Sequence, residues 1–325
     1  MDRIEECKQE YAKWLKRLGI TKISDINNAV NNNVHELINV SEAWHEQKVS
    51  EIALSIKNNQ KKVILISGPS SSGKTTFARK LQLHLRVLGI KALPISLDNY
   101  YIRKEEMPKN EEGEPDFESP ESINYRRFNE NLSELINGKE AIIPRFDFES
   151  SQVIEDAMHL KLNPHEIIIV EGIHGLNPML SETVDNDKKY RIYCSALSAI
   201  NTDSGDRIPS RINRMIRRLI RDNYFRNSDY SVTFSLWPNQ ETGSQKYIFP
   251  FTDSADVIFN SSLPYELCVY REHLIKMLSI APQDDKNIET INYLRDLVTS
   301  FLPISSDDVP RTSLVREFIG GGTLN

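Results

Sequence analysis

The stretch GPSSSGKT at residues 68–75 constrains this chain more than any other part of the sequence. It fits the pattern GxxxxGK[ST] at every fixed position, follows an apolar run at 63–67, and precedes a segment of helical character from Thr75. Gly68 and Gly73 permit backbone angles that other residues resist, so consecutive N–H groups can point at phosphate oxygens. The sequence therefore predicts a strand, a phosphate-binding loop and a helix. A serine-rich turn without a ligand is the alternative.

The same loop predicts which residues bind a nucleotide. Lys74 is expected to reach the β- and γ-phosphates, and the Thr75 hydroxyl is expected to bind Mg²⁺. ATP and Mg²⁺ are thus the predicted cofactors. The predicted nucleotide-binding residues are Gly68, Ser70, Ser71, Ser72, Gly73, Lys74, Thr75 and Thr76.

Further apolar runs predict the rest of the fold. They begin near Ile90, His165, Lys189 and Ala255, and helical segments alternate with them. This alternation is typical of an α/β fold whose sheet is mostly parallel. We therefore predict a P-loop NTPase-type sheet flanked by helices, with a helical extension over residues 1–60.

Composition and charge exclude several classes of protein. Apolar residues make up 39% of the chain, which supports a hydrophobic core, and the net charge of −6 argues against a non-specific nucleic-acid binder. Cys7, Cys194 and Cys268 are far apart, which fits a reducing cytosol rather than a zinc or disulfide framework. No apolar run approaches about 18 residues, so no membrane span is expected. The prediction is a cytoplasmic protein without a membrane or nucleic-acid partner; homo-oligomer formation is left open.

Two carboxylates follow predicted strands. Asp98 comes after ALPISL and Glu171 after IIIV. Because ligands of open α/β sheets bind at the carboxyl ends of the strands, both side chains are expected near the phosphates. Transfer of a phosphoryl group to a hydroxyl requires a residue that takes the proton and a residue that holds the metal. Asp98 fits the first role, unless it caps a turn, and Glu171 fits the second, directly or through water.

A basic segment, RIPSRINRMIRRLIRDNYFR, covers residues 207–226. Arg214, Arg217, Arg218 and Arg221 are three or four positions apart and share one face of a helix. Guanidinium groups bind phosphate oxygens through paired hydrogen bonds, so this face suits a phosphate clamp. A solvated surface or a nucleic-acid patch are the alternatives, and the acidic net charge favours the clamp.

The order of these motifs resembles that of the uridine kinases and phosphoribulokinases, a family of P-loop kinases. The resemblance rests on GPSSSGKTTFA, SLDNYY, PDFESPESINYRRF, IPRFDF, IIIVEGIHGL and RMIRRLIRD, and spans roughly residues 61–278. It is closest to bacterial uridine-kinase-like proteins (nucleoside kinases), whose kinase section also ends near EFIGG, here residues 317–321. The implied units are a helical extension at 1–60, a P-loop kinase domain with an arginine-rich lid at 61–280, and a helical and loop tail at 281–325.

The resemblance implies roles for individual residues. Asp98 matches the general base, while Arg214 and Arg217 match phosphate-contacting positions, so that with Lys74 they form the expected catalytic set. The acceptor-binding residues that it implies are Tyr101, Phe117, Glu118, Phe146 and Phe148. Two positions depart from the uridine kinase pattern: Glu118 replaces an aspartate, and Ser151 falls where a histidine reads the pyrimidine.

These observations predict an ATP- and Mg²⁺-dependent kinase that transfers the γ-phosphate to a hydroxyl of a small molecule, with a nucleoside as the first candidate. A kinase for a non-nucleoside polyol and a nucleotide-binding regulatory P-loop protein are the alternatives. A regulatory protein would not need Asp98 beside an acceptor-binding aromatic residue, and the sequence has no guanine-reading NKxD stretch. An RNA-binding role would require aromatic residues interleaved with the basic patch.

Overall fold

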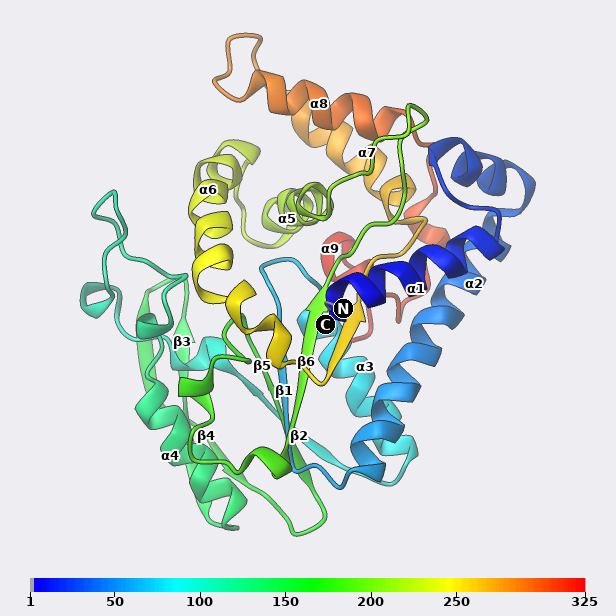
Figure 1. Cartoon of the computed structure of the whole chain (residues 1–325). Coiled ribbons are helices and arrows are strands. Elements are labelled where there is room, and N and C mark those ends of the chain that lie inside the picture. Colours follow the sequence, from blue (N-terminus) through cyan, green and yellow to red (C-terminus); the bar gives the residue numbers. More distant parts are fainter. Residues whose placement is uncertain (1–2, 325) are drawn as a thin grey trace.

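A five-stranded parallel sheet lies at the centre of the protein in the computed structural model, which describes residues 3–324 (Figure 1). Its strands are β1 (Val63–Ser67), β2 (Ala92–Ser96), β5 (Ile167–Glu171), β6 (Lys189–Ser195) and β7 (Val257–Asn260). The helices are α1 (Arg3–Arg17), α2 (Ile23–Asn58), α3 (Lys74–Val87), α4 (Tyr125–Ile136), α5 (Ser210–Phe225), α6 (Tyr230–Tyr247), α7 (Glu266–Leu278), α8 (Ile288–Thr299) and α9 (Arg316–Ile319). The predicted α/β fold with a parallel sheet is confirmed.

The strand order places the phosphate loop at a reversal in the sheet. The order is β2-β5-β1-β6-β7, and β1 pairs in parallel with β5 on one side and β6 on the other. From β1 the chain first forms the edge strand β2, then inserts β5 between the two, and continues with β6 and β7 on the other side of β1. In doubly wound sheets, the crevice at the carboxyl end of such a strand is where ligands bind.

Both faces of the central strands are buried, which explains their unbroken apolar sequences. Val63 and Leu65 of β1 belong to one hydrophobic cluster, while Ile64 and Ile66 belong to another on the opposite face. Alternate residues of a strand point to opposite faces, so each face of the sheet needs its own apolar layer.

An antiparallel hairpin, β3 (Glu140–Asp147) and β4 (Gln152–Lys161), stands apart from the main sheet beside α4 (Figure 1). The sequence analysis did not predict it. β4 is largely exposed and rich in polar residues, so it lacks the apolar run by which the central strands were found. The turn of the hairpin carries Ser151 in the left-handed region, with φ +56°.

The N-terminal helices pack directly on the α/β core. α1 contacts β7, α2 lies along α3, and Asn33 breaks the helical geometry of α2 with φ −163°. Tyr11 and Leu15 join the same hydrophobic cluster as Phe77 of α3. The predicted helical extension is confirmed, while the division of the chain at residues 60 and 280 stays a prediction because this one cluster runs across both boundaries.

Within residues 3–324, no helix combines the length and the apolar character needed to cross a lipid bilayer. The cysteines are all unpaired thiols. Cys194 and Cys268 are buried, and burial raises the pKa of each to about 12, so neither thiol is activated.

Candidate active site

The phosphate loop, residues 68–75, connects β1 to α3 and requires glycine at both ends. Gly73 has φ +86° immediately before α3, a conformation that favours glycine. A Cβ at Gly68 would lie 2.0 Å from the carbonyl oxygen of Cys194 in β6. The loop therefore follows the neighbouring strand so closely that no side chain fits at its first position.

Several polar groups of this loop are arranged as a ligand would require. The hydroxyls of Ser71, Ser72 and Thr76 are buried and have no hydrogen-bond partner among the described residues. The Lys74 ammonium donates a hydrogen bond to the carbonyl oxygen of Pro69, 3.1 Å away within the same loop. Buried hydroxyls without partners are uncommon. Together with the N-terminus of α3 they fit a polyphosphate.

Asp98 and Glu171 lie at the carboxyl ends of neighbouring strands, as the sequence predicts. The Glu171 carboxylate accepts a hydrogen bond from the Ser96 hydroxyl at 2.6 Å and one from the Thr75 hydroxyl at 3.4 Å. Ser96 also accepts from the backbone N–H of Asp98, so Ser96 is the residue that caps the turn after β2. The Asp98 side chain is not the cap of this turn, and the residue is exposed.

The pKa values of both carboxyls are raised. For Glu171, burial is the main cause and the negative charge of Asp98 adds to it. For Asp98, the loss of water among the surrounding protein atoms raises the pKa, while the positive charges of Lys74, Arg226 and Arg221 oppose the rise. Two carboxyls with raised pKa values beside one lysine are a common sign of a functional site.

Thr75 and Glu171 also fit the metal that the sequence predicts. A magnesium ion is usually bound by one or two protein oxygens together with phosphate oxygens and water. The hydroxyl of Thr75 and the carboxylate of Glu171 supply such a pair. In the part of the chain that the structure describes, no group of three or more His, Cys, Asp or Glu side chains is arranged to hold a metal.

The predicted acceptor-binding aromatic residues come together as one cluster, Tyr101, Phe117, Phe146 and Phe148. The ring of Tyr101 lies 5.8, 5.7 and 5.6 Å from the rings of the other three, measured between centroids. The Tyr101 hydroxyl donates a hydrogen bond to the carbonyl oxygen of Phe117, at 2.9 Å. Phe146 is buried and Phe148 is exposed, so the cluster has a face that can contact a ligand.

Glu118 packs against α6 at Gly243. A Cβ at Gly243 of α6 would lie 2.4 Å from that of Glu118, so a glycine is needed there. Burial raises the pKa of Glu118 to about 7, although the Arg218 charge lowers it. The same helix packs Trp237 beneath Arg214, with 5.5 Å between guanidinium and ring. The segment from Trp237 to Phe251 thus contacts both the arginines and the acceptor side.

The raised pKa of Glu118 predicts a pH-dependent effect on stability in the absence of ligands. Between pH 4.5 and about 7 the folded protein holds a proton that the unfolded chain has released, so the free energy of unfolding falls as the pH rises. Glu118→Gln removes this loss. Between pH 4.5 and 8, the free energy of unfolding of the variant should increase by about 1 kcal/mol or more relative to that of wild type, as measured by chemical denaturation. If the two proteins differ in free energy of unfolding by the same amount at every pH in this range, the pKa of Glu118 is not raised.

Arg214 and Arg217, the two arginines expected to contact phosphate, each form an ion pair with a glutamate. Arg214 donates to Glu241 at 2.6 Å. Arg217 is completely buried, donates to Glu266 of α7 at 2.6 and 2.9 Å, and also donates to the backbone carbonyls of Ser71 and Ser72. Burial would lower the pKa of Arg217, but Glu266 outweighs it and the pKa is raised. A guanidinium removed from solvent needs a carboxylate partner, which Glu266 supplies to Arg217. That Arg214 and Arg217 contact the transferred phosphate stays a prediction.

Three other arginines lie near the carboxyl groups of the site. The charge of Arg218 acts on Glu118, and the charges of Arg221 and Arg226 act on Asp98. Arg218 donates to the Ser70 hydroxyl of the phosphate loop at 2.7 Å. Asp222 is buried and pairs with all three arginines, at 3.0, 3.1 and 3.5 Å. Burial lowers the pKa of Arg218 to about 10, and the neighbouring arginines add to the effect, while Asp222 opposes it. The sequence placed Arg218 and Arg221 on the same helical face as Arg214 and Arg217. In the structure, Asp222 pairs with Arg218, Arg221 and Arg226 and holds these three as one group.

The chain is similar to a known protein family and to several known proteins. The family model described as "Phosphoribulokinase / Uridine kinase family" matches residues 63–266. A uridine kinase from Staphylococcus epidermidis is 29% identical over 202 residues, covering 62% of this chain and 87% of that protein. A uridine kinase from Staphylococcus aureus is 31% identical over 161 residues, covering 49% of this chain and 68% of that protein. The Arabidopsis thaliana protein "Inorganic pyrophosphatase TTM2" is 32% identical over 132 residues, which span 41% of this chain and only 18% of that protein.

Two solved structures have limited similarity to this chain. A possible uridine kinase from Bacillus stearothermophilus has a TM-score of 0.40 at 18% identity and covers 62% of this chain and 89% of its own. A putative fructose transport system kinase from Silicibacter sp. TM1040 has a TM-score of 0.44 at 15% identity. The match covers 65% of this chain and 98% of that protein.

Proposed function

Because the chain belongs to the phosphoribulokinase and uridine kinase family, whose members are phosphotransferases acting on a hydroxyl, we propose that it transfers the γ-phosphate of ATP to a hydroxyl of a small molecule. A nucleoside is the first candidate acceptor. The observation that carries the proposal is the meeting of Asp98 and Glu171 with Lys74 at the carboxyl ends of three adjacent strands.

Asp98 acts as the general base. Its carboxylate takes the proton of the acceptor hydroxyl as the new oxygen–phosphorus bond forms, and the bond to the departing ADP oxygen breaks. A raised pKa brings a carboxylate closer to neutral pH, where a base both stays ionised and accepts a proton readily. Lys74, Arg221 and Arg226 surround Asp98 with positive charge, which also favours the transferring phosphoryl group.

Thr75 and Glu171 would hold a magnesium ion, which would neutralise phosphate charge. The hydrogen bond from Ser96 fixes one oxygen of Glu171 and leaves the other toward Thr75. Arg218 connects the phosphate loop to the acceptor side, since it bonds Ser70 and its charge acts on Glu118. Asp222 positions Arg218, Arg221 and Arg226 as a set.

The acceptor binds between the aromatic cluster and Glu118. The exposed ring of Phe148 offers an apolar surface to a sugar or a base, with Tyr101 packed edge-on against it, and Glu118 offers an acceptor for sugar hydroxyls. The position at which uridine kinases read the pyrimidine holds Ser151, in the turn of the β3–β4 hairpin. Its side chain is shorter than that of histidine by most of a ring.

We therefore expect uridine and cytidine to be weak acceptors. A site without a residue that hydrogen-bonds a given base has little selectivity for that base. The measurement is kcat/KM for a panel of nucleosides, sugar phosphates and polyols with ATP and Mg²⁺. The best acceptor should exceed uridine by about tenfold or more. If uridine exceeds all others by several orders of magnitude, another residue reads the pyrimidine and the argument from Ser151 fails.

The same panel tests the alternative function. A regulatory P-loop protein would bind ATP but would transfer no phosphoryl group to any acceptor. Binding of ATP by calorimetry with no product from the whole panel, including hydrolysis products, would therefore favour that alternative over the kinase.

A further inference from the structure

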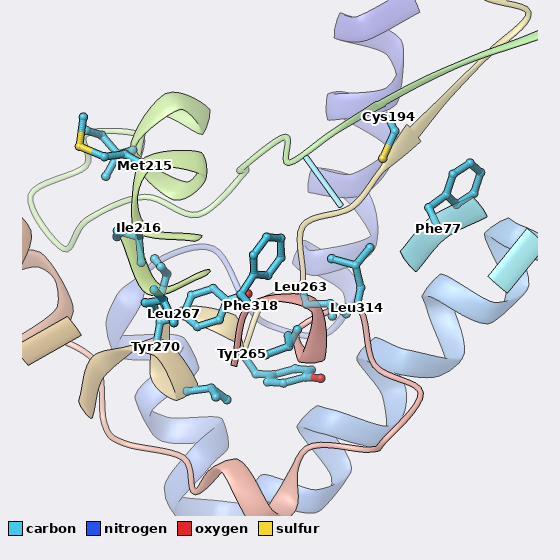
Figure 2. Packing of buried hydrophobic residues seen from close by; sticks show 14 of the residues in the cluster. Phe77, Cys194, Met215, Ile216, Leu263, Tyr265, Leu267, Tyr270, Leu314 and Phe318 are labelled. Carbon is cyan, nitrogen blue, oxygen red and sulfur yellow. The ribbon is translucent and has the colours of Figure 1, made fainter. Parts of the chain in front are cut away.

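The C-terminal segment, residues 313–319, returns to the phosphate loop and packs against it. A Cβ at Gly73 would lie 2.8 Å from a methyl carbon of Leu314, so the two residues are in close contact. The ring of Phe318 lies 5.0 Å from the guanidinium carbon of Arg217, which in turn donates to the loop carbonyls. Figure 2 shows Leu314 and Phe318 among buried residues of α5 and α7. The backbone of this segment is thereby fixed beside the loop.

Between these two anchors, Glu317 reaches the first turn of α3. Its carboxylate accepts a hydrogen bond from the backbone N–H of Thr76 at 3.1 Å. The N–H groups of the first helical turn have no partner within the helix, and together with the helix dipole they form a site for anions. In phosphate loops these N–H groups bind the α- and β-phosphates. A carboxylate of the protein itself thus holds a donor of the predicted nucleotide site.

This inference rests on the proposed function. We propose that Glu317 sets the affinity for nucleotide, because a nucleotide phosphate must displace its carboxylate from the Thr76 N–H. Glu317 is then a residue of the nucleotide site that comes from the C-terminal segment, outside the phosphate loop.

Three features favour displacement over coexistence. The Thr76 amide carries a single hydrogen, and two anions at one donor repel each other. Glu317 is only half-buried, while Leu314 and Phe318 are fully buried, so the carboxylate can rotate away without moving the anchors. The Thr76 hydroxyl is buried without a partner among the described residues, which leaves a second group there for an incoming ligand.

The test is direct titration of the full chain with ADP and Mg²⁺ by calorimetry, which needs no acceptor. Glu317→Ala should lower the Kd for ADP about tenfold, because the competing carboxylate is gone. Glu317→Gln has nearly the same shape and preserves folding; it should lower the Kd several-fold through loss of charge. Glu289→Ala removes an exposed carboxylate in the first turn of α8 and serves as the matched control, with an unchanged Kd.

The outcomes separate this inference from the proposed function. An unchanged or higher Kd in both Glu317 variants overturns the displacement proposal, because the carboxylate then does not compete with nucleotide. Lys74→Ala is titrated in parallel. If that variant binds ADP as tightly as wild type, the nucleotide site itself is wrongly assigned, whatever the Glu317 variants do.

Discussion

Replacing Lys74 with alanine is expected to reduce phosphoryl transfer by about 10³-fold or more, because the variant loses the one ammonium group of the phosphate loop. The folded protein should persist. The polar contact of Lys74 is to Pro69 within the same loop, and the side chain does not belong to either hydrophobic cluster. Initial rates in a coupled assay give the loss of activity, and the melting temperature reports folding.

Arg79→Ala is the matched control for Lys74→Ala. It removes a positive charge from an exposed position on the same helix and should leave the rate near that of wild type. If Lys74→Ala keeps most of its activity, residues 68–75 do not bind the transferred phosphate and the site has been assigned to the wrong part of the chain.

Asp98→Asn is expected to lower kcat by about 10²-fold or more, a typical contribution of a general base. Nucleotide affinity should change little, since Asp98 lies outside the phosphate loop. The wild-type rate should also fall as the pH falls through the raised pKa of Asp98, because a protonated carboxyl cannot accept the acceptor proton. The asparagine variant should lack this acid limb in its pH–rate profile.

The contrary result for Asp98 is equally specific. Weaker binding of ATP and Mg²⁺ with normal turnover at saturation would make Asp98 a metal ligand, and equal loss of folding would make it structural. Asp98→Glu provides a further comparison, since it retains the carboxyl but moves it, and should recover more of kcat than the asparagine variant does.

Local patterns in the sequence predict the elements that form the centre of the site. The phosphate loop is recognisable because glycine, lysine and threonine each meet a requirement within eight consecutive residues. The apolar strands β1 and β5 place Thr75 and Glu171 together, because parallel strands end at the same edge of the sheet. These conclusions depend on short-range spacing and on one general rule of topology.

Helical spacing could not identify the functional arginines. It shows that Arg214, Arg217 and Arg218 share a face, but the partner of each residue lies far away in sequence, at Glu241, Glu266 and Ser70. Glu241 and Glu266, distant in sequence, bind Arg214 and Arg217, whereas Asp222 of the same helix pairs with Arg218, Arg221 and Arg226. The contact between Glu317 and Thr76 is a similar case, since 241 residues separate the two in the chain.

The burial of Arg217 has a consequence for how this protein moves. The side chain joins the middle of α5 to α7 through Glu266 and to the phosphate loop through Ser71 and Ser72, with no exposed surface. The middle of α5 therefore cannot swing outward as a rigid lid without breaking a buried ion pair. The end of α5 and the turn into α6, residues 223–227, are exposed and lie outside these buried contacts. We therefore expect any opening of the site to be local to this end of α5 and the turn into α6, rather than a movement of the whole helix.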